Sequence, residues 1–96
     1  YVDDVARANV AAMRYSGPYA AFNIASGASI SIRALAEKVI ALAGSVSKIA
    51  HTSERPGDIK HSTADITKAK KVLGWSPQTP LDEGLMQTIE YYRKIV

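Results

Sequence analysis

Residues 30–44, ISIRALAEKVIALAG, carry the clearest structural signal of this chain and predict an amphipathic helix. Ser31 suits the N-cap, because its hydroxyl can accept a hydrogen bond from a free N–H of the first turn. Ile30 and Leu35 stand where the two members of a hydrophobic staple are found. Gly44 follows the last apolar position and can adopt the left-handed conformation that ends a helix. The apolar face comprises Ile32, Leu35, Ala36, Val39, Ile40, Leu42 and Ala43.

Toward the N-terminus, the next predicted element is a helix from about Asp4 to Tyr15. Asp3 and Asp4 suit its N-cap or first turn, where a carboxylate meets unpaired N–H groups and the positive end of the helix dipole. Ser16-Gly17-Pro18 ends the pattern. The two carboxylates do not form a paired acid site, since neighbouring residues on a helix point apart.

Toward the C-terminus, two further helices are predicted. Asp65 is expected to cap a short helix that runs through Leu73 and ends at Gly74. Thr79 is expected to cap the last helix, with Pro80 at the first helical position, where its missing N–H costs nothing. Trp75 lies between these helices and is read as a core residue rather than as a platform for a base or sugar.

Tyr19 to Ile24 and Lys48 to Thr52 are the two strand candidates. Two short strands make a thin sheet that seldom stands alone. The predicted class is therefore mixed α/β, with residues 1–96 as one region that completes a larger body and is a piece of a longer chain.

Composition limits the function of this chain. With 96 residues, 47% hydrophobic residues and 22% charged residues, it resembles an ordinary soluble domain. The net charge of +3 is spread along the sequence, so no nucleic-acid partner is expected. Apolar stretches are too short to cross a membrane. The absence of cysteine excludes disulfides and thiolate metal sites.

Several catalytic patterns are missing from the sequence. No glycine-rich phosphate loop of the G-x-G-x-x-G or G-x-x-x-x-G-K type occurs. None of the five tyrosines is followed four residues later by a lysine, so there is no Tyr-x-x-x-Lys pair. His51 and His61 do not follow a metal-ligand spacing, and no metal is expected.

The remaining candidate is the turn Arg55-Pro56-Gly57-Asp58, whose central Pro-Gly favours type II geometry. A guanidinium suits a diphosphate because its planar fork donates two parallel hydrogen bonds. An aspartate nearby could accept hydrogen bonds from ribose or sugar hydroxyls. The spacing alone favours a simpler interpretation, in which Arg55 and Asp58 pair with each other at the surface.

An ordered set of motifs favours a functional interpretation of this turn over a plain surface turn. YVDDVA spans residues 1–6, FNI spans 22–24 and is followed by Gly27, RPGDI spans 55–59, ADI-x-KA spans 64–69, LGW-x-P spans 73–77 and L-x-EGL spans 81–85. Together they resemble the C-terminal third of extended short-chain dehydrogenases/reductases, the NAD-dependent nucleotide-sugar epimerases and dehydratases, and among them the UDP-glucose 4-epimerase type. The resemblance covers nearly the whole chain.

This resemblance implies a C-terminal substrate-binding region of a Rossmann-fold enzyme, with the Rossmann core absent from this chain. The parent would interconvert gluco and galacto sugars by transient NAD-dependent oxidation at C4. The Tyr-x-x-x-Lys pair and the NAD site would lie outside residues 1–96, so this piece alone is expected to be inactive and to bind no cofactor.

The resemblance also assigns roles at the turn. Arg55 matches an arginine that contacts the UDP diphosphate, and Asp58 matches an aspartate that contacts the ribose. Ser62 matches a position that borders the hexose pocket, where a small side chain is compatible with N-acetylhexosamines as well as hexoses. With these roles, the functional interpretation of the turn is preferred to a plain surface turn.

The expected partners are a UDP-hexose or UDP-N-acetylhexosamine, the missing Rossmann domain and a second copy of the parent, in the cytoplasm. Two alternatives remain open. One is a fragment of a nucleotide-sugar dehydratase or decarboxylase, and the other is an autonomous assembly or binding module without catalysis.

Overall fold

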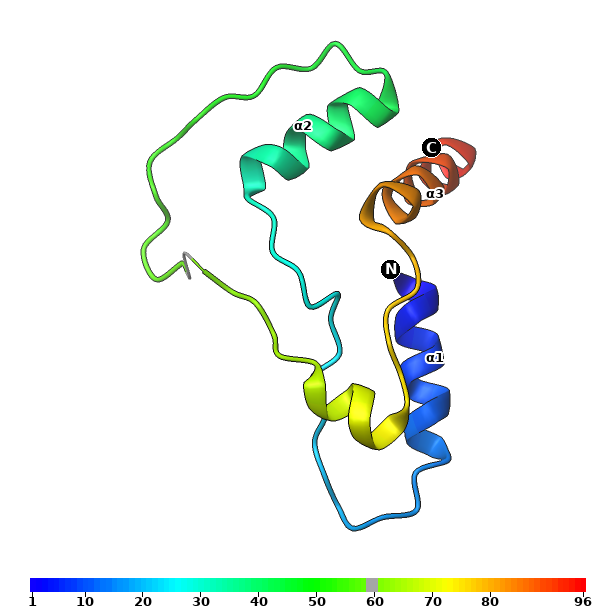
Figure 1. The fold of residues 1–96 in the computed structure, drawn as a ribbon. Coiled ribbons are helices and arrows are strands. Elements are labelled where there is room, and N and C mark those ends of the chain that lie inside the picture. Colours follow the sequence, from blue (N-terminus) through cyan, green and yellow to red (C-terminus); the bar gives the residue numbers. More distant parts are fainter. Residues whose placement is uncertain (59–60) are drawn as a thin grey trace. The chain divides into compact units, whose positions relative to one another are not determined.

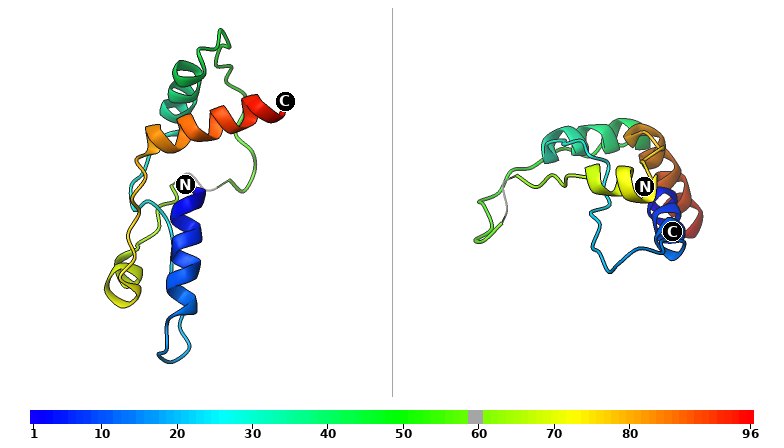
Figure 2. Two further views of the ribbon diagram at one scale, coloured as in Figure 1. Left: turned by 90° about the vertical axis from the view of Figure 1, so that its right-hand side faces the viewer. Right: turned by 60° about the horizontal axis from the view of Figure 1, so that its bottom comes forward.

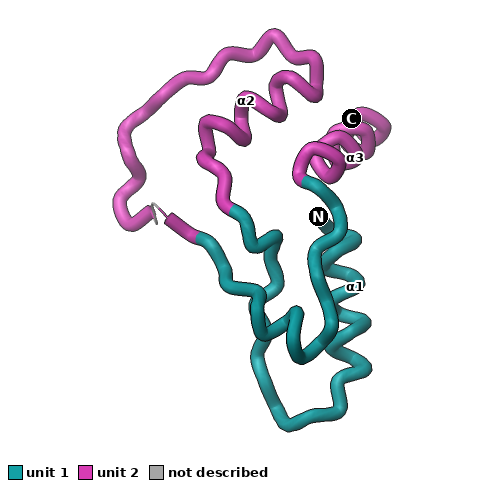
Figure 3. The backbone as a smooth tube through the Cα atoms, in the orientation of Figure 1, with its two compact units in different colours: residues 1–28, 63–80 teal, residues 29–62, 81–96 magenta. Residues whose placement is uncertain are grey.

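The computed structural model of the chain describes residues 1–58 and 61–96 and contains four helical elements (Figure 1). They are α1 (Val2–Met13), α2 (Ile32–Ala43), η1 (Ala69–Leu73) and α3 (Leu81–Ile95). The chain divides into two compact units (Figure 3). Unit 1 comprises residues 1–28 and 63–80, and unit 2 comprises residues 29–62 and 81–96.

Unit 1 contains the buried core. Ala69 is fully buried, and Ala8, Ile66 and Trp75 are each at most 5% exposed. Small residues at positions 8 and 69 let α1 and η1 approach closely, and the indole of Trp75 fills the remaining space. Trp75 is thus a core residue, as the sequence predicts. Partly buried residues complete the cluster: Phe22, Ile24, Ala25 and Leu73.

Asp4 ties α1 to the connector that precedes α3. Its side chain is buried, and its carboxylate accepts hydrogen bonds from the backbone N–H groups of Gln78 and Thr79, both at 3.1 Å. Arg7 donates to the same carboxylate as an ion pair within α1. The indole N–H of Trp75 donates to the backbone carbonyl of Asp4 at 2.9 Å. One turn of α1 therefore satisfies groups more than 70 residues away, as buried polar groups require.

Unit 2 is a pair of helices that lie side by side, α2 and α3 (Figure 2). Ser31 caps α2 as predicted, since its hydroxyl accepts a hydrogen bond from Ala34 N–H at 3.0 Å. Gly44 ends α2 in the left-handed region with φ 62°. Between the helices, Lys38 pairs with Asp82 at 2.7 Å, and the Arg93 guanidinium donates to a carbonyl at the C-terminus of α2.

The helices of the terminal segments differ in detail from the sequence prediction. α1 runs from Val2 to Met13 rather than from about Asp4 to Tyr15. The predicted short helix becomes two α-helical residues, 67–68, followed directly by the π-helical turn η1, which Gly74 ends with φ 64°. α3 begins at Leu81, one residue after the predicted first position, and the N–H of Thr79 is held by Asp4.

Both predicted strands are wrong. Residues 19–24 and 48–52 have no regular secondary structure, and residues 1–58 and 61–96 include no strand. A strand exists only when a neighbouring strand completes its hydrogen bonds. The two segments belong to different units, and neither unit supplies another extended edge among the residues described. The chain is therefore helical, as fits a region that lacks a Rossmann core, and its assignment as a single substrate-binding region remains a prediction.

Candidate functional site

The predicted site turn has the geometry that its sequence requires. Asp58 N–H donates to the Arg55 carbonyl at 3.2 Å, closing the four-residue turn. Gly57 has φ 82°, close to the value of a type II turn at the third position. An L-residue there would be strained, and Pro56 supplies the fixed φ that the second position needs. The type II prediction is confirmed.

The two charged side chains of this turn point to the outside. Arg55 and Asp58 are both exposed in unit 2. Within the described residues, no ion pair or hydrogen bond joins their side chains. The simpler interpretation expected these two side chains to pair, and in this detail it is wrong. Both charged residues are exposed on the closed turn, and their role as ligands remains a prediction.

Ser62, the third candidate, also lies in unit 2 and is exposed. Ile59, which belongs to the quoted motif, lies outside the described residues. Asp65 is placed in unit 1 and acts as a local cap, because its carboxylate accepts from Thr67 N–H at 2.9 Å and from the Thr67 hydroxyl at 2.6 Å. These hydrogen bonds, the hydroxyl first, lower the pKa of Asp65. It is not a member of the candidate site.

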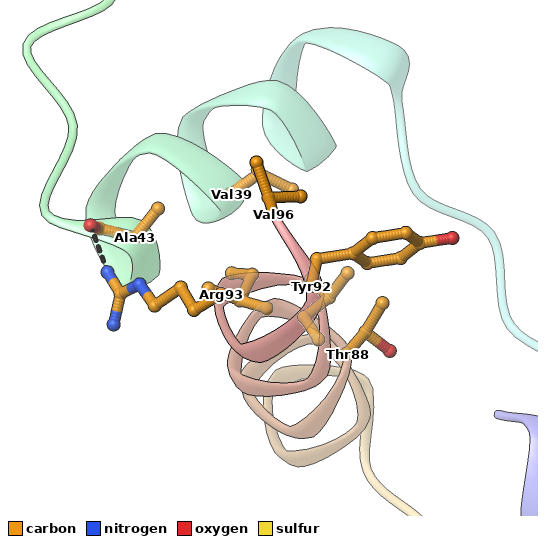
Figure 4. Close-up of a pocket in the computed structure, with 8 residues that line it drawn as sticks. Val39, Ala43, Thr88, Tyr92, Arg93 and Val96 are labelled. Carbon is orange, nitrogen blue, oxygen red and sulfur yellow. Dashed lines mark hydrogen bonds between the residues drawn. The ribbon is translucent and has the colours of Figure 1, made fainter.

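A shallow apolar groove of about 640 Å³ separates α2 from α3 (Figure 4). Two of its three polar side chains are engaged, since the Thr88 hydroxyl donates to the Gly84 carbonyl at 2.8 Å and Arg93 donates to the Ala43 carbonyl; the third is Tyr92. The groove therefore offers mainly van der Waals surface. Its lining comes from one face of each helix: Val39, Ala43, Leu85, Thr88, Ile89, Tyr92, Arg93 and Val96.

A metal site needs several His, Asp or Glu side chains that converge on one point. No cluster of three or more His, Asp or Glu side chains suited to a metal is found among the residues the structure describes. NAD requires backbone N–H groups of a glycine-rich loop at a helix start. The sequence has no such loop, so the chain itself does not fit the cofactor. In residues 1–58 and 61–96, no helix is long and apolar enough to cross a membrane.

Asp4 is the residue whose importance the sequence did not reveal. Its position predicted only a first-turn carboxylate, which it is. The hydrogen bond from Arg7, together with those from the N–H groups of Gln78 and Thr79, lowers its pKa to about 2, although burial acts in the opposite direction. The sequence signal that points this way is Trp75, because a buried indole N–H needs an acceptor. That acceptor is the backbone carbonyl of Asp4, so the signal leads to the position and not to its carboxylate.

A family model described as GDP-mannose 4,6 dehydratase matches residues 1–88, and the chain belongs to this family. The resemblance read from the motifs is thereby confirmed.

Three similar proteins show the range of the family. A UDP-glucose 4-epimerase from Thermotoga maritima, solved with UDP-glucose, is 41% identical with a TM-score of 0.93 over 99% of this chain and 30% of that chain. A UDP-N-acetylglucosamine 4-epimerase from Methanobrevibacter ruminantium, in complex with UDP-N-acetylmuramic acid, is 30% identical with a TM-score of 0.91 over 100% of this chain and 31% of that chain. UDP-glucuronic acid decarboxylase 1 from Xenopus tropicalis is 39% identical over 98% of this chain and 22% of its own length.

The share of each relative that is covered limits what these matches say. The chain spans about a third or less of the length of the relatives it matches. Those relatives act on nucleotide sugars by name, and their reactions differ. Membership of the family therefore fixes neither the sugar nor the reaction.

Proposed function

We propose that this chain is the nucleotide-sugar-binding part of a UDP-sugar 4-epimerase. The single observation that carries the proposal is the type II turn at residues 55–58, which presents Arg55 and Asp58 without pairing them with each other. Two of the three relatives above are 4-epimerases, solved with UDP-linked sugars. Both support a UDP-sugar as ligand.

In this proposal each site residue has one role. Arg55 donates hydrogen bonds to the diphosphate, where charge-assisted bidentate contacts are strongest. Asp58 accepts hydrogen bonds from the ribose hydroxyls. Ser62 borders the sugar and leaves room for an N-acetyl group as well as for a plain hexose. The ligand is thus a UDP-hexose or a UDP-N-acetylhexosamine.

The chemistry itself belongs to the parent protein. NAD, bound outside these residues, would take the hydride from C4 of the sugar and return it to the other face. This chain contains neither a Tyr-x-x-x-Lys pair nor a glycine-rich loop, so its residues bind and orient the substrate. The parent is proposed to be a cytoplasmic homodimer, and the 96 residues alone are proposed to be inactive.

A decarboxylase or dehydratase parent is the second candidate. The Xenopus decarboxylase is 39% identical, close to the value for the Thermotoga epimerase, and the family model bears a dehydratase description. In either case the turn would still hold a nucleotide sugar. The two candidates differ in the product that the parent releases, which is an isomer in one case and a shortened or dehydrated sugar in the other.

Calorimetric titration of the 96-residue chain with UDP tests the role of the turn. UDP should bind, and Arg55→Ala should weaken binding by about 1.5–3 kcal/mol, which is roughly ten- to a hundredfold in Kd. Arg33→Ala is the matched control, because Arg33 is an exposed arginine of the same unit that pairs with Glu37 at 3.1 Å. Equal affinities for the two variants would refute the assignment of Arg55. A chain that binds no UDP would favour the assembly module.

A further inference from the structure

Unit 2 has no buried core of its own. Within its described residues no apolar side chain is buried, whereas unit 1 buries Ala8, Ile66, Ala69 and Trp75. Gly84, which has no side chain, is the one buried residue in α2 and α3, both of which are described throughout. Two helices form a single layer, and such a layer is stabilised when its apolar face packs on a second layer. The α2–α3 pair therefore has a face that still needs a partner.

This face is the groove between α2 and α3 (Figure 4). Val39 of α2 and Tyr92 of α3 line it and are 37% and 55% exposed. Leu85, Ile89 and Tyr92 follow one another at four and three residues, which keeps them on one side of α3. Arg93 is the charged residue of the lining, and its guanidinium donates to a carbonyl at the C-terminus of α2. An apolar groove whose charged residue is already hydrogen-bonded suits a partner that is itself apolar.

The charges at the two ends of α3 indicate which partner fits. The first turn of this helix carries Asp82 and Glu83, and its last turn carries Arg93 and Lys94. When two such helices lie antiparallel, the acidic end of each meets the basic end of the other, and their dipoles are opposed. A parallel pair would bring like charges together instead. A twofold axis perpendicular to α3 produces the antiparallel arrangement, so the helix is complementary to a second copy of itself.

We propose that the α2–α3 groove is the contact surface between two copies of this chain. The copies place their α3 helices antiparallel, so that four helices form two layers with the groove residues of both copies between them. Glu83 of each copy faces Lys94 of the other, because these residues lie at opposite ends of α3. The interface does not use the turn at residues 55–58, so it goes beyond the proposed nucleotide-sugar role and does not rest on it.

Two adjacent tyrosines of α3 provide matched variants. Tyr92 lines the groove and Tyr91 does not, their exposed fractions are 55% and 60%, and their ring centroids are 5.5 Å apart. A glutamate at either position removes the same ring contact and adds the same charge to the same helix. Sedimentation equilibrium of the 96-residue chain should show monomers and dimers. Tyr92→Glu should raise the dimer Kd about a hundredfold, and Tyr91→Glu by no more than about twofold.

An exchange of charges tests the antiparallel orientation. Glu83→Lys or Lys94→Glu alone should raise the Kd about tenfold, since each places like charges opposite each other in the dimer. An equimolar mixture of the two variants should regain the affinity of the unsubstituted chain, because every glutamate then faces a lysine of the other variant. A substitution that only disturbs α3 would not be rescued by mixing.

A chain that stays monomeric at about 1 mM would overturn the proposal. Equal weakening by Tyr91→Glu and Tyr92→Glu would also overturn it, because the contact would then lie outside the groove. Val10→Glu, at a 44% exposed position of α1 in unit 1, should leave the Kd unchanged, and a loss as large as that of Tyr92→Glu would place the contact on unit 1.

Circular dichroism shows whether each variant keeps its helices. If Tyr92→Glu loses them, the exchange of charges decides alone, and a mixture that regains no affinity refutes the antiparallel contact. UDP binding enters none of these measurements, so the proposed role of Arg55 is tested separately.

Discussion

The Asp4–Trp75 cluster and the turn at residues 55–58 differ in what holds their side chains. Trp75 is 3% exposed and Asp4 is 4% exposed, and hydrogen bonds link them to each other and to the connector. Arg55 and Asp58 are exposed, and the turn that carries them is closed by a backbone hydrogen bond. The residues with candidate function are thus exposed and lie outside the buried core. A side chain must be free of structural partners to bind a ligand, and binding groups are commonly placed on loops for this reason.

The largest expected effect on stability comes from removing the side chain of Trp75, which lies in the buried core. Trp75→Ala should lower the free energy of unfolding by about 3–5 kcal/mol, because it empties the centre of unit 1 and removes the hydrogen bond to Asp4. Urea unfolding followed by circular dichroism measures it. The control is Tyr19→Ala, at a fully exposed position, where a change within about 0.5 kcal/mol is expected. Similar losses for both variants would mean that unit 1 has no cooperative core.

A smaller effect is expected from acid, through Asp4. Its pKa is about 2 in the folded chain against an ordinary value of 3.8, so the unfolded state binds more protons between these values. The stability contributed by Asp4 is fully present above pH 3.8 and is lost as the pH falls through about 2. Trp75 fluorescence during urea unfolding at a series of pH values measures this loss.

The matched variant for the acid experiment is Asp4→Asn. It keeps a side-chain carbonyl as an acceptor but cannot ionise, so it should be less stable at neutral pH and lose less stability in the acid range. Asp65 also has a lowered pKa and supplies part of any remaining acid response. An unchanged acid response in Asp4→Asn would show that the buried carboxylate does not hold the connector.

Two glycines with positive φ, one in each unit, allow a direct comparison of the core with the turn at residues 55–58. Gly27 has φ 76°, and a Cβ there would meet the side chain of Ile66 at 3.0 Å. Gly57 has φ 82° and open space around it. Gly27→Ala should therefore cost about 2 kcal/mol, from strain and crowding, and Gly57→Ala about 1 kcal/mol, from strain alone. Thermal unfolding of both variants decides the order, and the reverse order would contradict the packing of Ile66.

The smallest effect is expected at the surface of unit 2. Lys38→Ala removes the ion pair with Asp82, in which the side chains are 40% and 62% exposed. Such pairs contribute about 0.2–1 kcal/mol and are screened by salt. The difference in Tm from the unsubstituted chain should shrink between low and high ionic strength. A loss that persists in salt would show that Lys38 acts through packing instead.

Local signals in the sequence predicted the helices well. Ser31 and Gly44 bound α2 as expected, because a cap and a left-handed stop act within a few residues of themselves. The type II turn at 55–58 followed from Pro56 and Gly57 for the same reason. The ends of α1 and the beginning of α3 were displaced by one or two residues, since their boundaries depend on Asp4 and Thr79, which contact each other across the sequence.

The sequence by itself determined the elements whose hydrogen bonds close within one or two turns of backbone, and the motifs that place the chain in its family. Only the tertiary structure decided the rest. It showed that residues 19–24 and 48–52 are not strands, because a strand depends on a partner that propensity cannot supply. It showed that Asp4 holds a connector more than 70 residues away, and that α1 turns its valines outward. These features depend on contacts between distant segments, and no local pattern contains them.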